Sequence, residues 1–169
     1  MYSLAFDPAA RYSGAALLDP DGALVKYWTL DAGLLDKTNP QTNLRVVRGW
    51  VHEVCDFVAG FEVWHTVENL SHYMSNPAPA LRVQGVVLDR LDWHGHSEAL
   101  LIMPTVWQNA LGWKKTNVSK MTSKSWAKWQ CAAMGYDVTP TPGSKAAEDA
   151  RDAVLIARWR QLKEAGKVD

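Results

Sequence analysis

Residues 2–18 hold the feature that most constrains what this chain can fold into. They predict two short apolar strands: the first ends on Asp7, and the second begins near Ser13 and Gly14. Pro8 follows Asp7 and cannot donate to a sheet ladder, so it marks the end of the first strand. Asp7 is therefore left at a strand end among apolar residues, where an unpaired carboxylate is costly to bury. We expect a positive group to lie beside it, and a metal ion is one such group.

Turn and periodicity signals extend this hairpin into a larger sheet. The segment Asp19-Pro20-Asp21-Gly22 is a strong turn signal, and residues 23–30 predict a third strand, which completes an antiparallel meander. Apolar residues then recur every three or four positions between 42 and 61, as in an amphipathic helix, and the strand predicted after it ends on Glu68. A strand–helix–strand crossover places this strand parallel to a neighbour.

The second half of the chain predicts mostly helices. Helical segments are expected at 80–91, 106–111, 125–134 and 145–164, and a short buried strand at 98–103 is stopped by Pro104. A chain of 169 residues is long enough for one domain with a substantial core. We therefore predict a single α/β domain over residues 1–169, with a mixed five-stranded sheet of an antiparallel meander followed by parallel strands, flanked by helices.

Composition sets the cellular setting that we expect. The two cysteines, Cys55 and Cys131, lie in apolar helical patterns and are expected to be buried and reduced, which favours the cytoplasm over a secreted setting. The chain begins without a basic leader and has no apolar run of membrane-spanning length, so we expect a soluble protein with no membrane partner.

Charge is unevenly distributed along the chain. The formal net charge is zero, which argues against a protein that coats nucleic acid nonspecifically. Residues 99–136, however, contain no acid. Five lysines and three tryptophans lie in the second part of this segment: Lys114, Lys115, Lys120, Lys124, Lys128, Trp113, Trp126 and Trp129. Such a segment is either a solvated face or a surface for nucleic acid, in which lysines meet phosphates and aromatic rings stack on bases.

An acidic pair opens the last predicted helix. Asp149 and Asp152 are three residues apart, so both project from one face, and small or apolar residues surround them. Two like charges on a closely packed face destabilise the fold unless a cation offsets them. The alternative is that they are first-turn acids that interact favourably with the helix dipole.

The ordered set of acids resembles a known family, the RuvC-type Holliday-junction resolvases of the RNase H-like superfamily. The matching features are a strand ending in Asp7-Pro8 with a Ser13-Gly14 turn, a strand ending in Glu68, a strand followed by Pro104, and Asp149-x-x-Asp152-Ala. The resemblance covers most of the chain. The family has glycine where this chain has Ala9, which restricts the backbone in that turn.

The resemblance implies a homodimeric endonuclease that cleaves four-way DNA junctions in the cytoplasm of a bacterial or phage-infected cell. Asp7, Glu68, Asp149 and Asp152 would be its catalytic and metal-binding residues, with Asp7 bridging two divalent ions and Glu148 as an alternative to Asp149. Two such ions activate water and relieve charge on the leaving oxygen of a phosphodiester. Hard carboxylate oxygens select Mg²⁺, or Mn²⁺ in its place, over zinc. The expected DNA-binding residues are Tyr73, in the position of an aromatic residue of the bacterial enzymes, with Lys114, Lys115, Lys120 and Lys124.

Other functions stay open at this point. One alternative is a nuclease of the same superfamily that acts on forks, flaps or RNA–DNA hybrids instead of four-way junctions. Another is a non-catalytic module that binds junctions; such a module would keep the lysines but lose the acids, and all four acids are present. An actin-like nucleotide-binding protein also opens with an aspartate and a glycine turn, but needs a second lobe for which 169 residues leave no room. His94 and His96 can chelate a metal in principle, although such a loop pair more often binds nothing. The helix at 80–91 carries apolar residues that serve either the core or a dimer interface.

Overall fold

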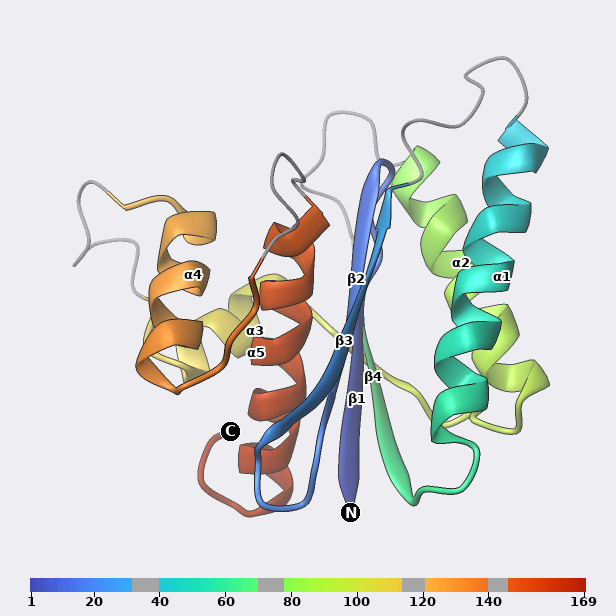
Figure 1. The fold of residues 1–169 in the computed structure, drawn as a ribbon. Helices are drawn as coiled ribbons and strands as arrows, with labels where there is room; N and C mark the ends of the chain where they lie inside the picture. The colour runs from blue at the N-terminus through green and yellow to red at the C-terminus, as the bar shows by residue number, and fades with distance from the viewer. Residues whose placement is uncertain (32–39, 70–77, 114–120, 140–145) are drawn as a thin grey trace.

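The computed structural model describes residues 1–31, 40–69, 78–113, 121–139 and 146–169 (Figure 1). Its strands are β1 (Tyr2–Asp7), β2 (Tyr12–Leu18), β3 (Leu24–Asp31), β4 (Val63–Glu68) and β5 (Leu100–Ile102). Its helices are α1 (Pro40–Val58), α2 (Ala78–Trp93), α3 (Pro104–Ala110), α4 (Ser123–Ala133) and α5 (Ala146–Glu164). Each of these elements was predicted from the sequence, with ends that differ by a few residues.

The strands form one five-stranded sheet in the order β3-β2-β1-β4-β5. β1, β2 and β3 are joined as an antiparallel meander, whereas β4 pairs with β1 in parallel and β5 pairs with β4 in parallel. This arrangement confirms the predicted mixed sheet. The Asp19 side chain closes the β2–β3 turn by accepting hydrogen bonds from the backbone of Asp21 and Ala23, and Gly22 adopts the positive φ of 88° that this turn requires.

Helices cover both faces of the sheet (Figure 1). α1 and α2 lie against one face, while α5 crosses the other, with α3 and α4 on its outer side. Alternating side chains of β1 divide between the two cores, because successive residues of a strand point to opposite faces. Leu4 and Phe6 belong to the core under α1 and α2, and Ala5 belongs to the core under α5.

The α5 face of the sheet is built from small residues near its centre. Ser3 and Ala5 of β1 and Ala16 of β2 are fully buried there, and the Ser3 hydroxyl donates to the Ala157 carbonyl of α5 at 2.9 Å. Small side chains on both surfaces let the helix backbone lie close to the sheet. The position of α5 is therefore set by backbone contact, which keeps the residues of its first turns in a defined place.

Three local features can be compared with the expectations from the sequence: the cysteines, the start of α4 and the length of the helices. Cys55 and Cys131 are buried free thiols, and burial raises the pKa of Cys131 to about 12. α4 begins at Ser123, two residues earlier than predicted, because the Thr122 side chain caps it by accepting a hydrogen bond from the Ser125 backbone. Among the helices of the described ranges, none is both long and apolar enough to cross a membrane.

Candidate metal centre

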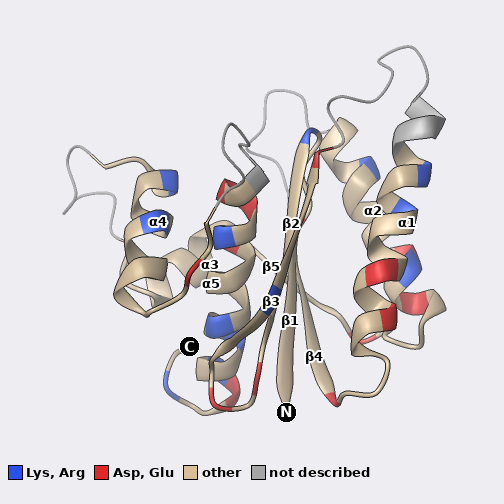
Figure 2. Cartoon of the chain, in the orientation of Figure 1, with Lys and Arg blue, Asp and Glu red and all other residues tan. Residues whose placement is uncertain are grey.

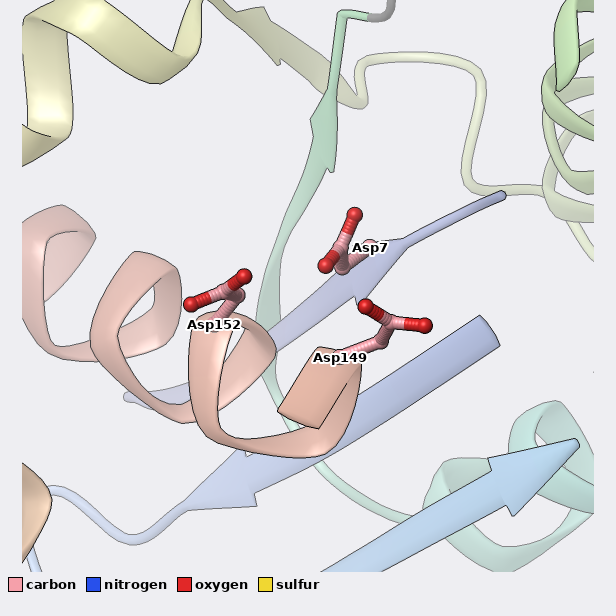
Figure 3. A group of neighbouring side chains, drawn as sticks. All are labelled: Asp7, Asp149 and Asp152. Carbon is pink, nitrogen blue, oxygen red and sulfur yellow. The ribbon is translucent and has the colours of Figure 1, made fainter. Parts of the chain in front are cut away.

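Three aspartates that are far apart in the sequence converge at one end of the sheet (Figure 3). Asp7 is the last residue of β1, and Asp149 and Asp152 come from the first two turns of α5. One carboxylate oxygen of each lies within 4.8 Å of the others, a spacing that allows them to share a metal ion. Among the described residues, these three aspartates form the one group of three or more Asp, Glu, His or Cys side chains close enough to bind one metal ion together.

Gly14 makes this convergence possible. It is the β2 partner of Asp7 in the antiparallel ladder, so the two residues face the same side of the sheet. A Cβ atom on Gly14 would lie 2.3 Å from the Asp149 backbone carbonyl and 2.4 Å from the nitrogen of Ala150, far inside van der Waals contact. The absence of a side chain therefore lets the first turn of α5 rest directly on β2, next to Asp7.

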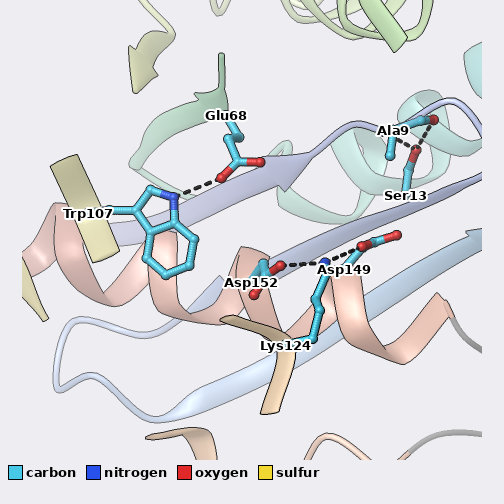
Figure 4. Close-up of polar contacts among 7 residues, drawn as sticks. All are labelled: Ala9, Ser13, Glu68, Trp107, Lys124, Asp149 and Asp152. Atoms are coloured by element: carbon cyan, nitrogen blue, oxygen red, sulfur yellow. Dashed lines mark hydrogen bonds and ion pairs between the residues drawn. The ribbon is translucent and has the colours of Figure 1, made fainter. Parts of the chain in front are cut away.

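The turn after Asp7 is held by Ser13. The Ser13 hydroxyl accepts a hydrogen bond from the Ala9 backbone nitrogen at 3.1 Å and donates to the Ala9 carbonyl at 3.3 Å (Figure 4). Ala9 thus completes the turn in place of the glycine of the resembled family, with its backbone groups satisfied by a side chain from the next strand.

Lys124 of α4 reaches into the cluster and pairs with two of its acids. Its ammonium lies 2.6 Å from Asp149 Oδ1 and 2.6 Å from Asp152 Oδ2 (Figure 4). Figure 2 shows this basic helix beside the acidic first turn of α5. Sequence reasoning placed Lys124 among the DNA-binding lysines and missed this contact, because residues 25 and 28 positions apart meet only through the packing of α4 on α5.

Glu68 lies at the end of β4 and outside the aspartate trio, but still close to it. It is 7% exposed, and its negative charge contributes to raising the pKa of Asp7. Its Oε1 accepts a hydrogen bond of 2.8 Å from the indole Nε1–H of Trp107 in α3 (Figure 4). The sequence motif around Pro104 includes this tryptophan, but nothing in the motif indicated its partner.

The cluster has a surplus of buried negative charge. The pKa values of all four acids are raised, and burial is the largest cause in each case. The pKa of Asp152 rises to about 7. Burial alone would lower the pKa of Lys124, but Asp152, Asp7 and Asp149 outweigh it and hold that pKa above its ordinary value. Four carboxylates thus face one ammonium, and this set of hard oxygen donors fits a divalent cation such as Mg²⁺.

The alternatives raised by the sequence lie elsewhere. Glu148 is exposed and is not part of the trio. The rings of His94 and His96 contact two different partners: His94 Nε2 lies 2.7 Å from His52 Nδ1, and His96 stacks on His65 at a centroid distance of 4.0 Å. The pair is therefore not arranged as a joint chelate.

The predicted DNA contacts are only partly within the described residues. Tyr73, Lys114, Lys115 and Lys120 lie outside them, so these assignments stay predictions. The three tryptophans of the acid-free segment differ: Trp126 is buried at 3% exposure, Trp113 packs against it at a centroid distance of 5.6 Å, and Trp129 is 56% exposed. Of these, Trp126 serves the core, whereas Trp129 is accessible for stacking.

Comparison with known proteins identifies the fold. No protein-family model and no curated protein matches the sequence of this chain. The structure matches Thermus thermophilus RuvC in complex with a Holliday-junction substrate, with a TM-score of 0.71 and 16% identity over 100% of this chain and 98% of that one. It matches a second Thermus thermophilus RuvC structure with a TM-score of 0.70 and 17% identity over 100% and 99% of the two chains. The chain has the RuvC-type, RNase H-like fold.

Proposed function

We propose that residues 1–169 form a single nuclease domain that cleaves four-way DNA junctions by metal-dependent hydrolysis of phosphodiester bonds. The observation that carries this proposal is the convergence of Asp7, Asp149 and Asp152 in one buried cluster, with Glu68 beside it. A structural protein gains nothing from four acids in one place, since their repulsion and desolvation oppose folding. The full-length match in fold to a protein described with its Holliday-junction substrate supports the choice of DNA.

The four acids are proposed as the metal ligands and catalytic residues. The negative charges of Glu68, Asp149 and Asp152 each raise the pKa of Asp7, so Asp7 interacts electrostatically with all three other acids. We therefore assign it the bridging position. Divalent ions held there, Mg²⁺ or Mn²⁺ in its place, would supply an activated water and charge stabilisation at the leaving oxygen. Burial of the carboxylates keeps bulk water away and strengthens each electrostatic contact.

Lys124 is proposed to act at the same place as a phosphate contact. Its side chain is 39% exposed, so part of it can be reached by a ligand from solvent. Lys114, Lys115 and Lys120, which we call the basic-segment lysines, precede α4 in the chain and are proposed to bind the DNA backbone together with Tyr73. These contacts would place the acids at a phosphodiester, since lysines attract the phosphates that the acids repel.

A homodimer is proposed from the likeness to the resolvases, because a symmetric junction needs two active sites. The apolar residues of α2 do not add support: Val83, Val86 and Val87 are buried in the core against α1 and the sheet, while Leu81 stays 44% exposed. Sedimentation at micromolar concentration is expected to give twice the chain mass. A monomer that still cuts junctions symmetrically would contradict the dimer.

One experiment tests the proposed function directly. The protein is incubated with four-way, forked and linear DNA, with Mg²⁺ or with EDTA, beside the variants Asp152→Asn and Glu148→Gln. We expect symmetric cleavage of the four-way junction with Mg²⁺ only. Asp152→Asn should abolish cleavage but keep junction binding, because it removes a ligand charge and not a phosphate contact. Glu148→Gln is the matched control, since it removes one acid from the same turn of α5 outside the trio, and it should cleave normally.

The other outcomes point to the other functions. Cleavage of forks or flaps in preference to junctions would indicate a related nuclease that acts on other branched DNA. Binding without cleavage under any metal would indicate a junction-binding module. Cleavage that persists in EDTA, or near-normal cleavage by Asp152→Asn, would contradict the metal-dependent mechanism.

A further inference from the structure

The indole of Trp107 donates a hydrogen bond to a carboxylate of the candidate metal centre. Trp107 is fully buried in the core between α3, α4 and α5, and its Nε1–H donates to Glu68 Oε1 at 2.8 Å (Figure 4). A hydrogen bond to a charged acceptor is stronger than one between neutral groups. The bond therefore fixes one oxygen of a carboxylate that the proposed function assigns to metal binding.

Other buried tryptophans of the chain do without such a partner. The indole nitrogens of Trp28, Trp50 and Trp159 are buried, and none of them has a hydrogen-bond partner among the residues that the structure describes. Trp159 is the closest comparison, because it is 1% exposed and lies in the same core cluster as Trp107. A buried indole in this protein is thus tolerated as a purely apolar group, and the carboxylate partner sets Trp107 apart.

The backbone holds the two residues in this relation. Glu68 of β4 is paired with Ile102 of β5 in the parallel ladder, and α3 begins two residues later at Pro104. Trp107 follows in the first turn of this helix, so the path from Glu68 to the indole runs through one strand pairing and one tight connection. Movement of the indole relative to the carboxylate is limited by both.

We infer that Trp107 is a positioning residue, which orients the Glu68 carboxylate for metal binding through its indole N–H. With Oε1 held by the indole, Glu68 cannot rotate freely, and its second oxygen faces a fixed direction. Hydrogen bonds to a ligating carboxylate typically change metal affinity by about 10- to 100-fold when they are removed. The inference rests on the proposed function, because it assumes that Glu68 is a metal ligand.

The test compares two substitutions of the same kind. Trp107→Phe and Trp159→Phe each shorten a buried indole to a phenyl ring in one core cluster, but only the first removes a hydrogen bond to Glu68. Mn²⁺ binding to the metal-free proteins is measured by calorimetry, and thermal melting is recorded on the same samples. Trp107→Phe should weaken Mn²⁺ binding about 10-fold, and Trp159→Phe should leave it unchanged. Cleavage by Trp107→Phe should recover at high Mn²⁺ concentration.

Two further measurements separate orientation from packing. In a Glu68→Gln background, Trp107→Phe should have no further effect on Mn²⁺ affinity. In the wild-type protein, which does not depend on a variant that folds, the indole ¹⁵N–H signal of Trp107 should shift on saturation with Mg²⁺, and that of Trp159 should not. Equal Mn²⁺ affinities of the two phenylalanine variants, or an unmoved Trp107 signal, would overturn the inference. A wild-type protein that binds no Mn²⁺ would instead overturn the proposed function.

Discussion

Replacing Lys124 with methionine would remove the ammonium from a cluster of four buried acids and keep most of the side-chain volume. The ammonium lies 2.6 Å from Asp149 and 2.6 Å from Asp152, and its charge also acts on Asp7 and Glu68. Without metal, we expect Lys124→Met to be clearly less stable than the wild type at pH 8.5 and nearly as stable at pH 6. With saturating Mg²⁺ the difference at pH 8.5 should shrink, because the metal supplies the missing charge.

The size of the effect follows from burial and from the pKa values. Breaking a buried ion pair costs about 3–5 kcal/mol, but the Lys124 side chain is 39% exposed. Solvent screening therefore reduces the expected loss to about 1–3 kcal/mol. Burial raises the pKa of Asp152 to about 7 even though Lys124 lowers it, so without the ammonium this carboxyl takes up a proton at a higher pH, and the proton replaces the lost charge. One proton bound only by the folded state changes the free energy of unfolding by about 1.4 kcal/mol per pH unit, which accounts for a loss below about 1 kcal/mol at pH 6.

Urea unfolding at pH 6 and pH 8.5, with EDTA or with Mg²⁺, measures these differences. Lys128→Met is the matched control, since Lys128 lies one turn further along α4 and is exposed. It should change the free energy of unfolding by less than about 0.5 kcal/mol in every condition. If Lys124→Met lost the same stability at both pH values and with Mg²⁺, its contribution would be packing of the aliphatic chain, and the electrostatic reasoning would be wrong.

Three further predictions follow from the same site. Gly14→Ala should lower the melting temperature and abolish metal-dependent cleavage, because the new Cβ would overlap the Asp149 backbone and displace α5; normal cleavage would contradict this. The metal-free protein should lose stability as the pH rises from about 4 to about 7, since the raised pKa of Asp152 means that the folded state holds a proton that the unfolded chain releases; urea unfolding that is flat over this range would refute it. Alanine at the three basic-segment lysines should weaken binding to all branched DNA alike. It should also reduce the slope of the logarithm of the DNA-binding constant against the logarithm of salt concentration by about one unit for each lost contact; an unchanged slope would mean that these lysines are only solvated surface residues.

The fold was predictable because its signals are local. Short apolar runs, the Asp19–Gly22 turn and the three-to-four-residue spacing in α1 each arise within a few residues, and the structure confirms the strands, the turn and the helix that they predict. The ends of elements were less predictable. β5 has three residues instead of the six expected, because strand pairing with β4 covers only Leu100–Ile102. Whether a residue at the end of an apolar run joins a ladder depends on its neighbour strand, which a single segment does not reveal.

The candidate site was predictable only as far as topology carries it. Asp7 and Glu68 end strands that pair in parallel directions, so both must lie at the same edge of the sheet. The contacts of Lys124 and Trp107 were not predictable: Lys124 meets its acids through the packing of α4 on α5, and Trp107 meets Glu68 only once β5 has paired with β4. In sequence, a lysine near a helix start and an apolar tryptophan both have simpler explanations, and only their distances to carboxylates in the structure distinguish them.

The acid cluster and the small-residue face of the sheet depend on each other. Four carboxylates with raised pKa values oppose folding, so α5 needs a compensating attachment to keep Asp149 and Asp152 beside Asp7. That attachment is the close contact of fully buried alanines of α5 with the sheet, together with the hydrogen bond from Ser3 to Ala157 about two turns beyond the acids. Dispersion and apolar burial along the helix do not depend on pH or metal. α5 therefore holds the acids in place by contacts that need no cation, so a metal ion bound there would meet a preformed site.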